Sequence, residues 1–324
     1  MKYNRFLIVL LFVVGFISCN NPKKQHAIPR VGFIEAFEDA TIGDARKGFI
    51  EALAANGFNE QNKTVEIVSK NAQSDMGAMN QIVSYMQSEA VDCIGTSTTM
   101  STLATVQRVK DIPIFMCVTA MPEILGLTNK EKKGPKNLFG VGEDLNYIDT
   151  SFTIIQQVVK PKKKDNLRIG MIYNQAEQQS VDAFNRLDKL AKEKQVDLIA
   201  LPLNTSADAQ LVVRALLKRK IDAFFANPDN TVFAAFETIL NNCNQNDVPV
   251  FTSEVGLVKR GAVAAYGADI YQWGYQAGQE AAKFLKSKKT DNLKVEKVNI
   301  RRRVYNGAAA ARFGLTFSGG FEKL

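Results

Sequence analysis

The feature that most limits the fold of this chain is an alternation of segments that runs through it twice. Short runs rich in β-branched residues are followed by longer stretches with apolar residues at helical spacing, which is typical of βα units and parallel sheets. Helices between the runs begin at plausible caps such as Asp44 and Ser206. We therefore expect an α/β protein, with predicted strands at 30–35, 64–69, 91–95, 112–118, 168–173, 196–201, 221–226 and 248–252.

The first half of this pattern resembles the second in three places, in the same order. The matching segments are RVGFIEA with RIGMIYN, VDCIGTSTTMSTLATV with IDAFFANPDNTVFAAF, and IPIFMCVTA with VPVFTSEVG. Three ordered similarities favour a duplicated architecture over chance, so we predict two α/β lobes of like topology. Between the two halves, NLFGVGEDLNY predicts a strand that leaves the first lobe, then a turn and a new helix.

Small polar residues follow most of the predicted strands. In open parallel sheets, ligands bind beyond the carboxyl ends of the strands. Most of these loops lead into a helix N-terminus, where free N–H groups favour anions. Ordinary caps and turns use the same residues, so a single loop is weak evidence. Because such loops recur on one edge of both predicted lobes, we predict a ligand-binding cleft between them.

The N-terminal residues predict export and a lipid anchor. Two basic residues precede an apolar run of twelve residues that starts at Phe6, too short for a transmembrane helix of about 20 residues. A basic start, a short apolar run and a small residue before the break are typical of a secretory signal peptide. The break, FISC, resembles a bacterial lipobox with Phe16 in place of the usual leucine. We expect residues 1–18 to be removed and Cys19 to tether the protein, through 19–29, to a bacterial membrane outside the cytoplasm.

Composition excludes several other classes of function. The formal net charge is +8, but the basic residues lie in scattered clusters without interleaved aromatic residues, which argues against nucleic acid as a partner. Cys93, Cys117 and Cys243 are too few and too scattered for a disulfide framework or a metal site, and the first two lie in apolar strands, where we expect core positions. His26 is the only histidine, which removes most Ser-His, Cys-His and zinc chemistry. We expect no cofactor and no metal.

Five motifs carry a family resemblance along nearly the whole chain, from about Arg30 to Leu315: NAQSD, GMIYNQAEQQSV, NPDNTV, VPVFTSEVGLVKRGAVAAYGADIYQWGYQAG and NGAAAARFGL. They resemble the ABC-transporter substrate-binding family that includes tryptophan/tyrosine-binding lipoproteins. The resemblance implies a type I periplasmic-binding-protein fold, in which two Rossmann-like lobes joined by a multi-strand hinge close around a small ligand. It also implies a monomer that works with an ABC permease and its ATPase, without chemistry on the ligand.

The same resemblance implies a division of the chain between the lobes. Lobe one would comprise 30–142 and 267–295, and lobe two 143–266 and 296–324, with the chain returning to lobe one near Gly267. One loop departs from the family, because Thr119-Ala120-Met121-Pro122 stands where members usually read Thr-Asp-Pro. The loop GTSTTMST also lacks the proline that is typical after its first threonine.

The predicted cleft has the groups that an amino-acid zwitterion needs, and amino acids are the ligands we expect. Hydroxyls backed by helix N-termini suit its carboxylate: Thr96, Ser97, Thr98 and Thr119. The candidates for its ammonium are Glu177, Asp229, Glu254 and Asp269. Further contacts are expected from Phe37, Glu38, Asp39, Asn174, Ser180, Asn227 and Asn230. Asp229 could equally be a helix N-cap, and Glu177 a first-turn acid that favours the helix dipole.

An aromatic ligand would need apolar faces, for which Phe37, Tyr173 or Tyr266 are candidates. Tyr271 and Trp273 are predicted to pack within a helix instead. Peptides, purines and small sugars remain open as ligands, although the position of the only tryptophan in a helix weighs against a sugar.

Two other functions fit a two-lobed scaffold. The first is a sensory protein, which would signal ligand binding to a membrane receptor. Genes for a permease and an ATPase next to the gene of this protein would favour transport instead. An enzyme would use paired acids such as Asp229 and Glu254. No nucleophile elbow, metal cluster or suitably placed histidine in the sequence supports an enzyme.

Overall fold

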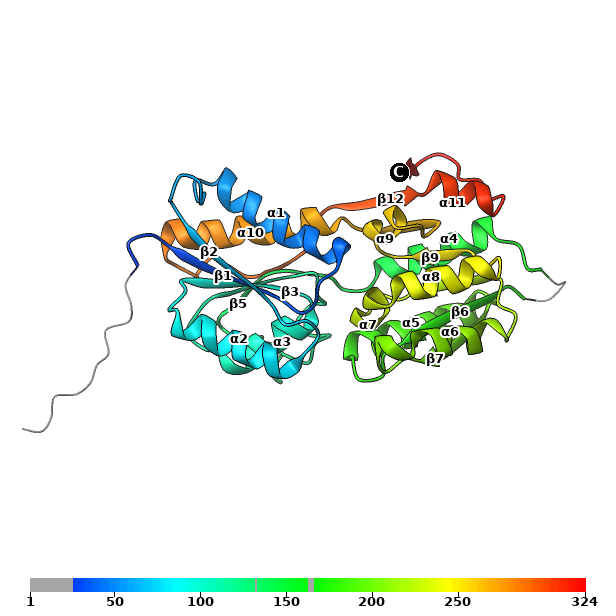
Figure 1. The fold of residues 1–324 in the computed structure, drawn as a ribbon, viewed down its shortest axis with the longest axis horizontal. Coiled ribbons are helices and arrows are strands. Elements are labelled where there is room, and N and C mark those ends of the chain that lie inside the picture. Colours follow the sequence, from blue (N-terminus) through cyan, green and yellow to red (C-terminus); the bar gives the residue numbers. More distant parts are fainter. Residues whose placement is uncertain (1–25, 132, 163–165) are drawn as a thin grey trace, which may run out of the picture.

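The computed structural model describes residues 26–131, 133–162 and 166–324, so the predicted signal peptide and Cys19 lie outside the described residues. Two α/β lobes lie side by side along the long axis of the molecule, each with a central sheet between helices (Figure 1). Within the described ranges, no helix combines the length and the apolar character needed to cross a membrane.

The sheet of lobe one is parallel throughout and has the order β11-β5-β4-β3-β1-β2. Helices on both faces bury its central strands. The strands are β1 (Arg30–Glu35), β2 (Glu66–Asn71), β3 (Cys93–Ser97), β4 (Ile114–Cys117), β5 (Leu138–Gly142) and β11 (Val295–Lys297). One face carries α1 (Ala40–Ala55) and α10 (Ile270–Ser287), and the other α2 (Met76–Ser88) and α3 (Thr99–Arg108).

The sheet of lobe two has the order β13-β12-β10-β9-β8-β6-β7 and is parallel except for the pair β10–β12. Its strands are β6 (Arg168–Tyr173), β7 (Asp197–Pro202), β8 (Ala223–Ala226), β9 (Val250–Thr252), β10 (Ala264–Ala268), β12 (Arg301–Tyr305) and β13 (Glu322–Lys323). One face carries α4 (Tyr147–Val158), α5 (Gln178–Glu193) and α11 (Gly307–Arg312). The other carries α6 (Ala209–Leu217) after a 3₁₀ turn (Ser206–Asp208), then α7 (Asn230–Ala234), α8 (Phe236–Gln245) and α9 (Val255–Lys259).

The predicted α/β fold with two lobes of like topology is confirmed. All eight predicted strands are present, and each begins and ends within two residues of its prediction. The strand order β4-β3-β1-β2 of lobe one recurs as β9-β8-β6-β7 in lobe two. The predicted strand, turn and helix between the halves are β5 and α4. Cys93 and Cys117 are fully buried, as expected of core residues.

The chain passes between the lobes three times, after β5, after β10 and after β11. Two of these crossings differ from the boundaries that the family resemblance implied. β10 continues to Ala268 in the second sheet, so the chain returns to lobe one at Asp269 rather than at Gly267. β11 pairs with β5, so residues 296 and 297 still belong to lobe one and the last crossing follows Lys297.

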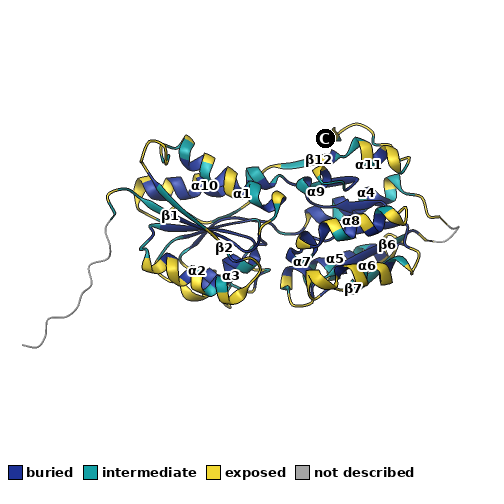
Figure 2. Cartoon of the chain, viewed as in Figure 1, coloured by how far each residue is buried: buried dark blue, intermediate teal, exposed yellow. Residues whose placement is uncertain are grey.

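The late helix α10 is fixed to lobe one by a close backbone contact with α1. A Cβ atom on Gly48 would lie 2.1 Å from the carbonyl oxygen of Tyr271, and one on Gly274 would lie 1.9 Å from that of Ala45. Only glycine permits this approach, because real Cβ atoms do not come so close to backbone atoms. Burial follows the layers, with buried strands inside and exposed residues on the outer helix faces (Figure 2).

Candidate ligand-binding site

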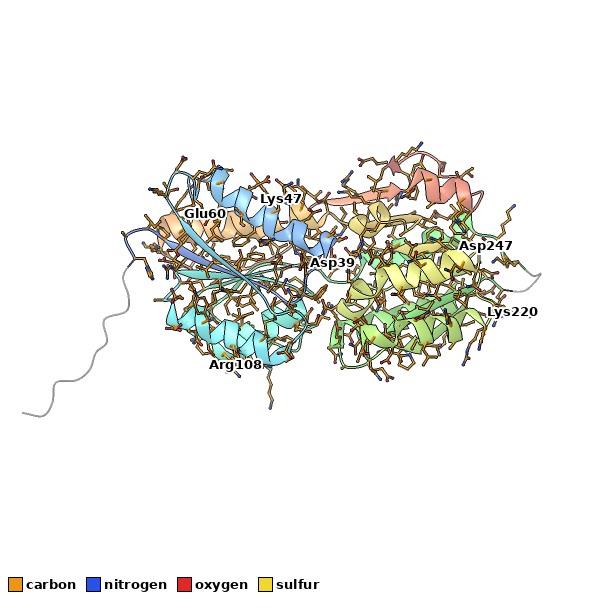
Figure 3. The ribbon with its side chains drawn as sticks, viewed as in Figure 1. Asp39, Lys47, Glu60, Arg108, Lys220 and Asp247 are labelled. Atoms are coloured by element: carbon orange, nitrogen blue, oxygen red, sulfur yellow. The ribbon has the colours of Figure 1, made fainter. Side chains whose placement is uncertain are left out.

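The carboxyl ends of the two sheets meet at a cavity between the lobes. Asp39, in the loop after β1, lies at this boundary, whereas Lys220 and Asp247 lie at the far end of lobe two (Figure 3). The cavity measures about 40 Å³, room for only a few water molecules, so the lobes are closed on each other. It is lined by Ile42, Val118, Thr119, Ala120, Glu143, Leu145, Tyr147, Gln179, Pro228, Asp229, Asn230, Phe233, Glu254 and Trp273.

Two β-branched residues at the lobe-one edge have a positive φ angle. Thr98, directly after β3, has a φ of 82°, and Val118, directly after β4, has a φ of 51°. This backbone conformation is unfavourable for a branched side chain, by about 1–3 kcal/mol per residue. Such strain persists only where the surrounding structure holds it, and it is concentrated at binding sites. The two residues therefore mark this edge as a candidate site.

The four predicted hydroxyl residues of lobe one are all buried at this edge: Thr96, Ser97, Thr98 and Thr119. The Oγ1 atoms of Thr96 and Thr102 are 3.0 Å apart, and those of Thr99 and Thr119 are 2.9 Å apart. In contrast, the hydroxyls of Ser97 and Thr98 have no hydrogen-bond partner among the described residues. Helix α3 begins here without a side-chain cap, which leaves its first amides as donors. This edge can therefore receive an anion.

On the lobe-two side, Asp229 is buried at the centre of a hydrogen-bond network. Its Oδ1 accepts from the backbone amides of Thr231 at 2.7 Å and Val232 at 3.0 Å, which caps α7. Its Oδ2 accepts from the amide of Asn174 at 2.7 Å and from the Ser180 hydroxyl. Both carboxylate oxygens thus accept hydrogen bonds from donors of lobe two. Of the two roles considered for Asp229 from the sequence, the structure shows the helix N-cap.

Glu177 joins the same network through its own carboxylate. Its Oε2 accepts from Nδ2 of Asn230 at 2.7 Å, and its Oε1 accepts from the Thr231 hydroxyl at 3.2 Å. Burial, and next the charge of Asp229, raise the pKa of Glu177 to about 7; burial raises the pKa of Asp229 as well. The structure thus brings together six predicted residues: Asn174, Glu177, Ser180, Asn227, Asp229 and Asn230.

Glu254 differs from these two acids because one of its oxygens is free. The side chain follows β9 and is 3% exposed. Its Oε1 accepts from the Tyr147 hydroxyl at 2.9 Å, whereas Oε2 has no hydrogen-bond partner in the described part of the chain. Burial raises the pKa of Glu254 to about 8, although the hydrogen bond from Tyr147 lowers it. Burial therefore favours the uncharged form of Glu254.

Outside the hinge, polar contacts between described residues join the lobes at two places, and at the first of them Arg260 also donates to the Thr41 hydroxyl at 3.2 Å. Nη1 of Arg260, which follows α9 in lobe two, donates to Oδ2 of Asp39 at 2.6 Å, and Asp39 is the N-cap of α1 in lobe one. Farther along the interface, the Thr99 hydroxyl at the start of α3 donates to Oε1 of Gln179 in α5. These contacts explain why the cavity between the lobes is small.

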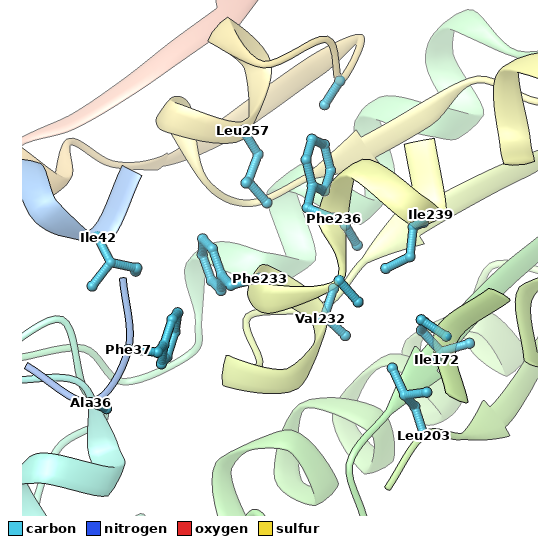
Figure 4. Close-up of a cluster of buried hydrophobic side chains, with 14 of the residues drawn as sticks. Ala36, Phe37, Ile42, Ile172, Leu203, Val232, Phe233, Phe236, Ile239 and Leu257 are labelled. Carbon is cyan, nitrogen blue, oxygen red and sulfur yellow. The ribbon is translucent and has the colours of Figure 1, made fainter. Parts of the chain in front are cut away.

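Apolar side chains close the interface between these polar contacts. Phe37 and Ile42 of lobe one face Phe233 and Leu257 of lobe two, and all four are buried in one cluster (Figure 4). Phe37 thus contributes to the contact between the lobes, whereas Ile42 and Phe233 also line the cavity.

Several predicted residues lie away from the cavity. Glu38 is exposed. Asp269 caps α10 and pairs with Arg302 at 2.9 Å in the hinge. The rings of the two tyrosines that were considered for an aromatic ligand are covered by protein: Tyr173 stacks on Phe184 with centroids 4.5 Å apart, and Tyr266 lies under the Arg303 guanidinium.

Ten residues that line the cavity were not predicted as site residues, among them Glu143, Tyr147, Gln179, Phe233 and Trp273. Trp273 packs in α10 as predicted, with Nε1 donating to the carbonyl of Val141 at 2.9 Å, but it also borders the cavity. Glu143 directly follows β5, so the strand-end rule that selected the other loops would have found it.

Two duplicated lobes, three crossings and a cavity between the strand ends define a two-lobed binding protein with the type I periplasmic-binding-protein fold. The sequence model of the ABC transporter substrate binding protein family matches residues 30–322. The chain therefore belongs to this family, whose members are substrate-binding proteins and not enzymes.

Individual relatives agree with this assignment. A tyrosine-binding protein from Clostridioides difficile is 29% identical over 283 residues, which cover 87% of this chain and 80% of the relative. A conserved domain protein from Vibrio cholerae superposes with a TM-score of 0.81 at 27% identity, over 91% of this chain and 99% of that one. An ABC domain from Streptococcus pneumoniae, crystallised with L-Trp, superposes with a TM-score of 0.80 at 19% identity, over 90% and 97%.

Proposed function

We propose that this protein captures an amino acid, preferably an aromatic one, between its lobes and delivers it to an ABC permease and its ATPase for import. The observation that carries the proposal is the distribution of buried polar atoms without partners. Within the described residues there are four such side-chain atoms, on Ser97, Thr98, Asn227 and Glu254. All four residues lie at, or within two residues after, the end of a strand at the facing edges of the two sheets, and Glu254 also lines the cavity. Buried polar groups are normally paired, so this distribution supports a polar ligand at that place.

The two edges suit the two ends of a zwitterion. The hydroxyls of Ser97 and Thr98, together with the uncapped start of α3, supply donors for a carboxylate. Across the interface, Glu254 supplies a buried carboxyl group for an ammonium. We assign the ammonium to Glu254 rather than to Asp229, because both oxygens of Asp229 already accept hydrogen bonds within lobe two.

The preference for an aromatic side chain rests on the walls of the cavity and on the relatives. Phe233 and Trp273 line the cavity, and rings of this kind pack well against an aromatic ligand. A tyrosine-binding protein and a domain crystallised with L-Trp are among the relatives. Because the closed cavity measures about 40 Å³, the lobes must separate to admit such a ligand and must close around it differently.

Thermal shift of the full-length chain in detergent tests this proposal. Each of the common amino acids is added separately, with indole and 4-methylphenol as controls that present the aromatic ring alone. A ligand at a hundred times its dissociation constant stabilises the fold by about 2.7 kcal/mol. We expect the largest shifts from tyrosine and tryptophan and none from the ring controls. No shift with any amino acid would reject amino-acid capture.

We propose further that Cys19 anchors the exported protein to a membrane. The support is the sequence pattern, with a basic start, a short apolar run and a cysteine before a polar tether. Cys19→Ser should abolish incorporation of labelled fatty acid and release the protein from the membrane fraction, whereas Asn20→Ser beside it should leave both unchanged. Lipid labelling that persists in Cys19→Ser would refute the anchor.

A further inference from the structure

Glu254 is a buried acid in a position that calls for a positive partner. It lines the cavity, it is 3% exposed, and its Oε2 accepts no hydrogen bond from the described residues. We infer that a cationic group of the ligand binds at Glu254 and that its binding releases the proton which this side chain otherwise carries. The inference rests on the proposed function, because it requires a ligand with an ammonium group.

The groups that face Glu254 do not supply a positive charge. From α4, the Tyr147 hydroxyl donates to Oε1 at 2.9 Å. From the first crossing, Glu143 adds negative charge. Arg301 at the start of β12 is held by both oxygens of Glu143, at 2.7 and 2.8 Å. Asp229 in another wall of the cavity is a further acid.

Two other cations of the neighbouring elements are also engaged by acids. Arg302 of β12 pairs with Asp269 at 2.9 Å and also with Glu322. Arg260, beyond the far end of α9, pairs with Asp39 and Glu237. Of the rest, Lys259 at the end of α9 is exposed, and Arg303 of β12 lies over the rings of Tyr266 and Phe321. With no charge to pair with it, a buried carboxylate keeps its proton, which agrees with a Glu254 pKa of about 8.

A ligand ammonium would reverse this balance. It provides both the missing hydrogen-bond donor and the opposite charge, and either one favours the ionised carboxylate. The proton then leaves Glu254 for the solvent as the ammonium enters, so the net charge of the site does not change. Affinity for an amine should therefore rise about tenfold per pH unit between pH 6 and pH 8 and level off above pH 8. A deaminated analogue gains nothing from this exchange.

Calorimetry of the full-length chain in detergent measures the proton directly. The ligand is whichever of tyrosine and tryptophan gives the larger thermal shift, and the matched probe is the same molecule without its amino group. Titrations at pH 7 in phosphate and in Tris, which differ in heat of ionisation, give the number of protons exchanged. We expect about one proton to be released per amino acid bound, and none with the deaminated probe.

Two variants locate the source of the proton. Glu254→Gln should abolish the release and flatten the pH profile, whereas Glu177→Gln, which removes the other acid with a strongly raised pKa, should retain the release. Tyr147→Phe removes the hydrogen bond that lowers the pKa of Glu254, so it should move the midpoint of the affinity profile to higher pH even if Glu254→Gln fails to fold.

The outcomes separate this inference from the proposed function. Binding of the amino acid without proton release, or release that persists in Glu254→Gln, would overturn the inference and leave amino-acid capture intact. No binding by either amino acid would overturn both.

Discussion

Nη2 of Arg301 lies 2.7 and 2.8 Å from the two carboxylate oxygens of Glu143, and Nε adds a third hydrogen bond at 3.1 Å. Glu143 belongs to the first crossing between the lobes, and Arg301 is the first residue of β12, directly after the third crossing. Lys297, the last residue of β11 before the third crossing, pairs with Asp144 of the first crossing at 2.6 Å. Because Arg302 also pairs with Asp269 of the second crossing, all three connections are linked by ion pairs beside the cavity.

Breaking the hinge pair should destabilise the protein. Arg301→Met would leave the buried carboxylate of Glu143 without its partner, which costs about 3 kcal/mol in the free energy of unfolding. Urea denaturation at pH 7 measures this loss of stability. The loss should be smaller at pH 5, because burial already raises the pKa of Glu143. Without Arg301, the carboxyl group of Glu143 takes up a proton more readily and is then no longer an unpaired charge. Lys189→Met, which removes an exposed pair with Glu193 at 4.0 Å, should change the stability by less than about 0.5 kcal/mol. Equal effects of the two variants would contradict this role.

The pair between Asp39 and Arg260 should hold the lobes together. Asp39→Asn keeps the cap on α1, since Asn and Asp cap about equally well, but it removes the charge that crosses the interface. We expect a larger radius of gyration without ligand in small-angle scattering, and an affinity lower by about 5- to 30-fold. Glu237→Gln is the matched control, because Glu237 contacts Arg260 from within lobe two. A radius that stays unchanged in Asp39→Asn would contradict a closing role.

Thr98 should contribute to binding at some expense of stability. Thr98→Val keeps the branched shape and removes only the unpaired hydroxyl, so the affinity for an amino acid should fall about 10- to 100-fold without loss of stability. Thr98→Gly also relieves the positive φ angle and should raise the free energy of unfolding by about 1 kcal/mol. Calorimetric titration and urea denaturation measure the two effects. Unchanged affinity in both variants would remove Thr98 from the binding site.

Replacing Asp229 and Glu254 by their amides should have opposite effects on stability and on ligand affinity. Asp229→Asn places an amide group among four donors, two of them at Oδ2, so we expect a loss of about 1–3 kcal/mol in stability. Glu254→Gln should leave the ligand-free protein at least as stable as the wild type at pH 8, while the affinity for an amino acid falls. Thermal unfolding with and without ligand separates the two effects. A stable Asp229→Asn variant that no longer binds ligand would reverse our assignment of the ammonium.

Stability should also depend on pH through Glu254. Its pKa in the folded protein is about 8, above the ordinary 4.5, so the folded state binds more protons than the unfolded state between these values. The contribution of Glu254 is complete below about pH 4.5 and is lost as the pH rises towards 8, by up to about 1.4 kcal/mol per pH unit. Glu254→Gln should remove this decline, while the decline due to Glu177 remains. Parallel pH profiles of variant and wild type in urea denaturation would contradict the raised pKa.

The sequence predicted the strands well because each buried strand is a compact run of β-branched and aromatic residues, and both lobes repeat the same order. The third crossing was placed too early because β11 has only three residues, which is too few for a periodic pattern. Its place in the sheet depends on pairing with β5, a contact between residues far apart in the chain.

The loops around the cavity were predicted for a similar reason, since strand ends are visible in a sequence. What the residues in those loops contact was not visible. Both carboxylate oxygens of Asp229 accept hydrogen bonds, whereas one oxygen of Glu254 accepts none. This difference depends on which hydrogen-bond donors lie nearby, and those donors come from several loops and helices. Tyr147 and Trp273 line the cavity from helices in which periodicity predicts only packing.

The contact of α10 with α1 has a consequence for how the protein is made. When only the segment from β1 to β5 has been synthesised, the helix that covers α1 is missing. That helix, α10, is synthesised only after most of lobe two. Lobe two is incomplete as well, since β10 needs β12 for its antiparallel partner. Neither lobe has all the elements that cover its core until translation has nearly ended. This order of elements delays folding during synthesis, which suits the proposed export, because an unfolded chain can be threaded through a membrane.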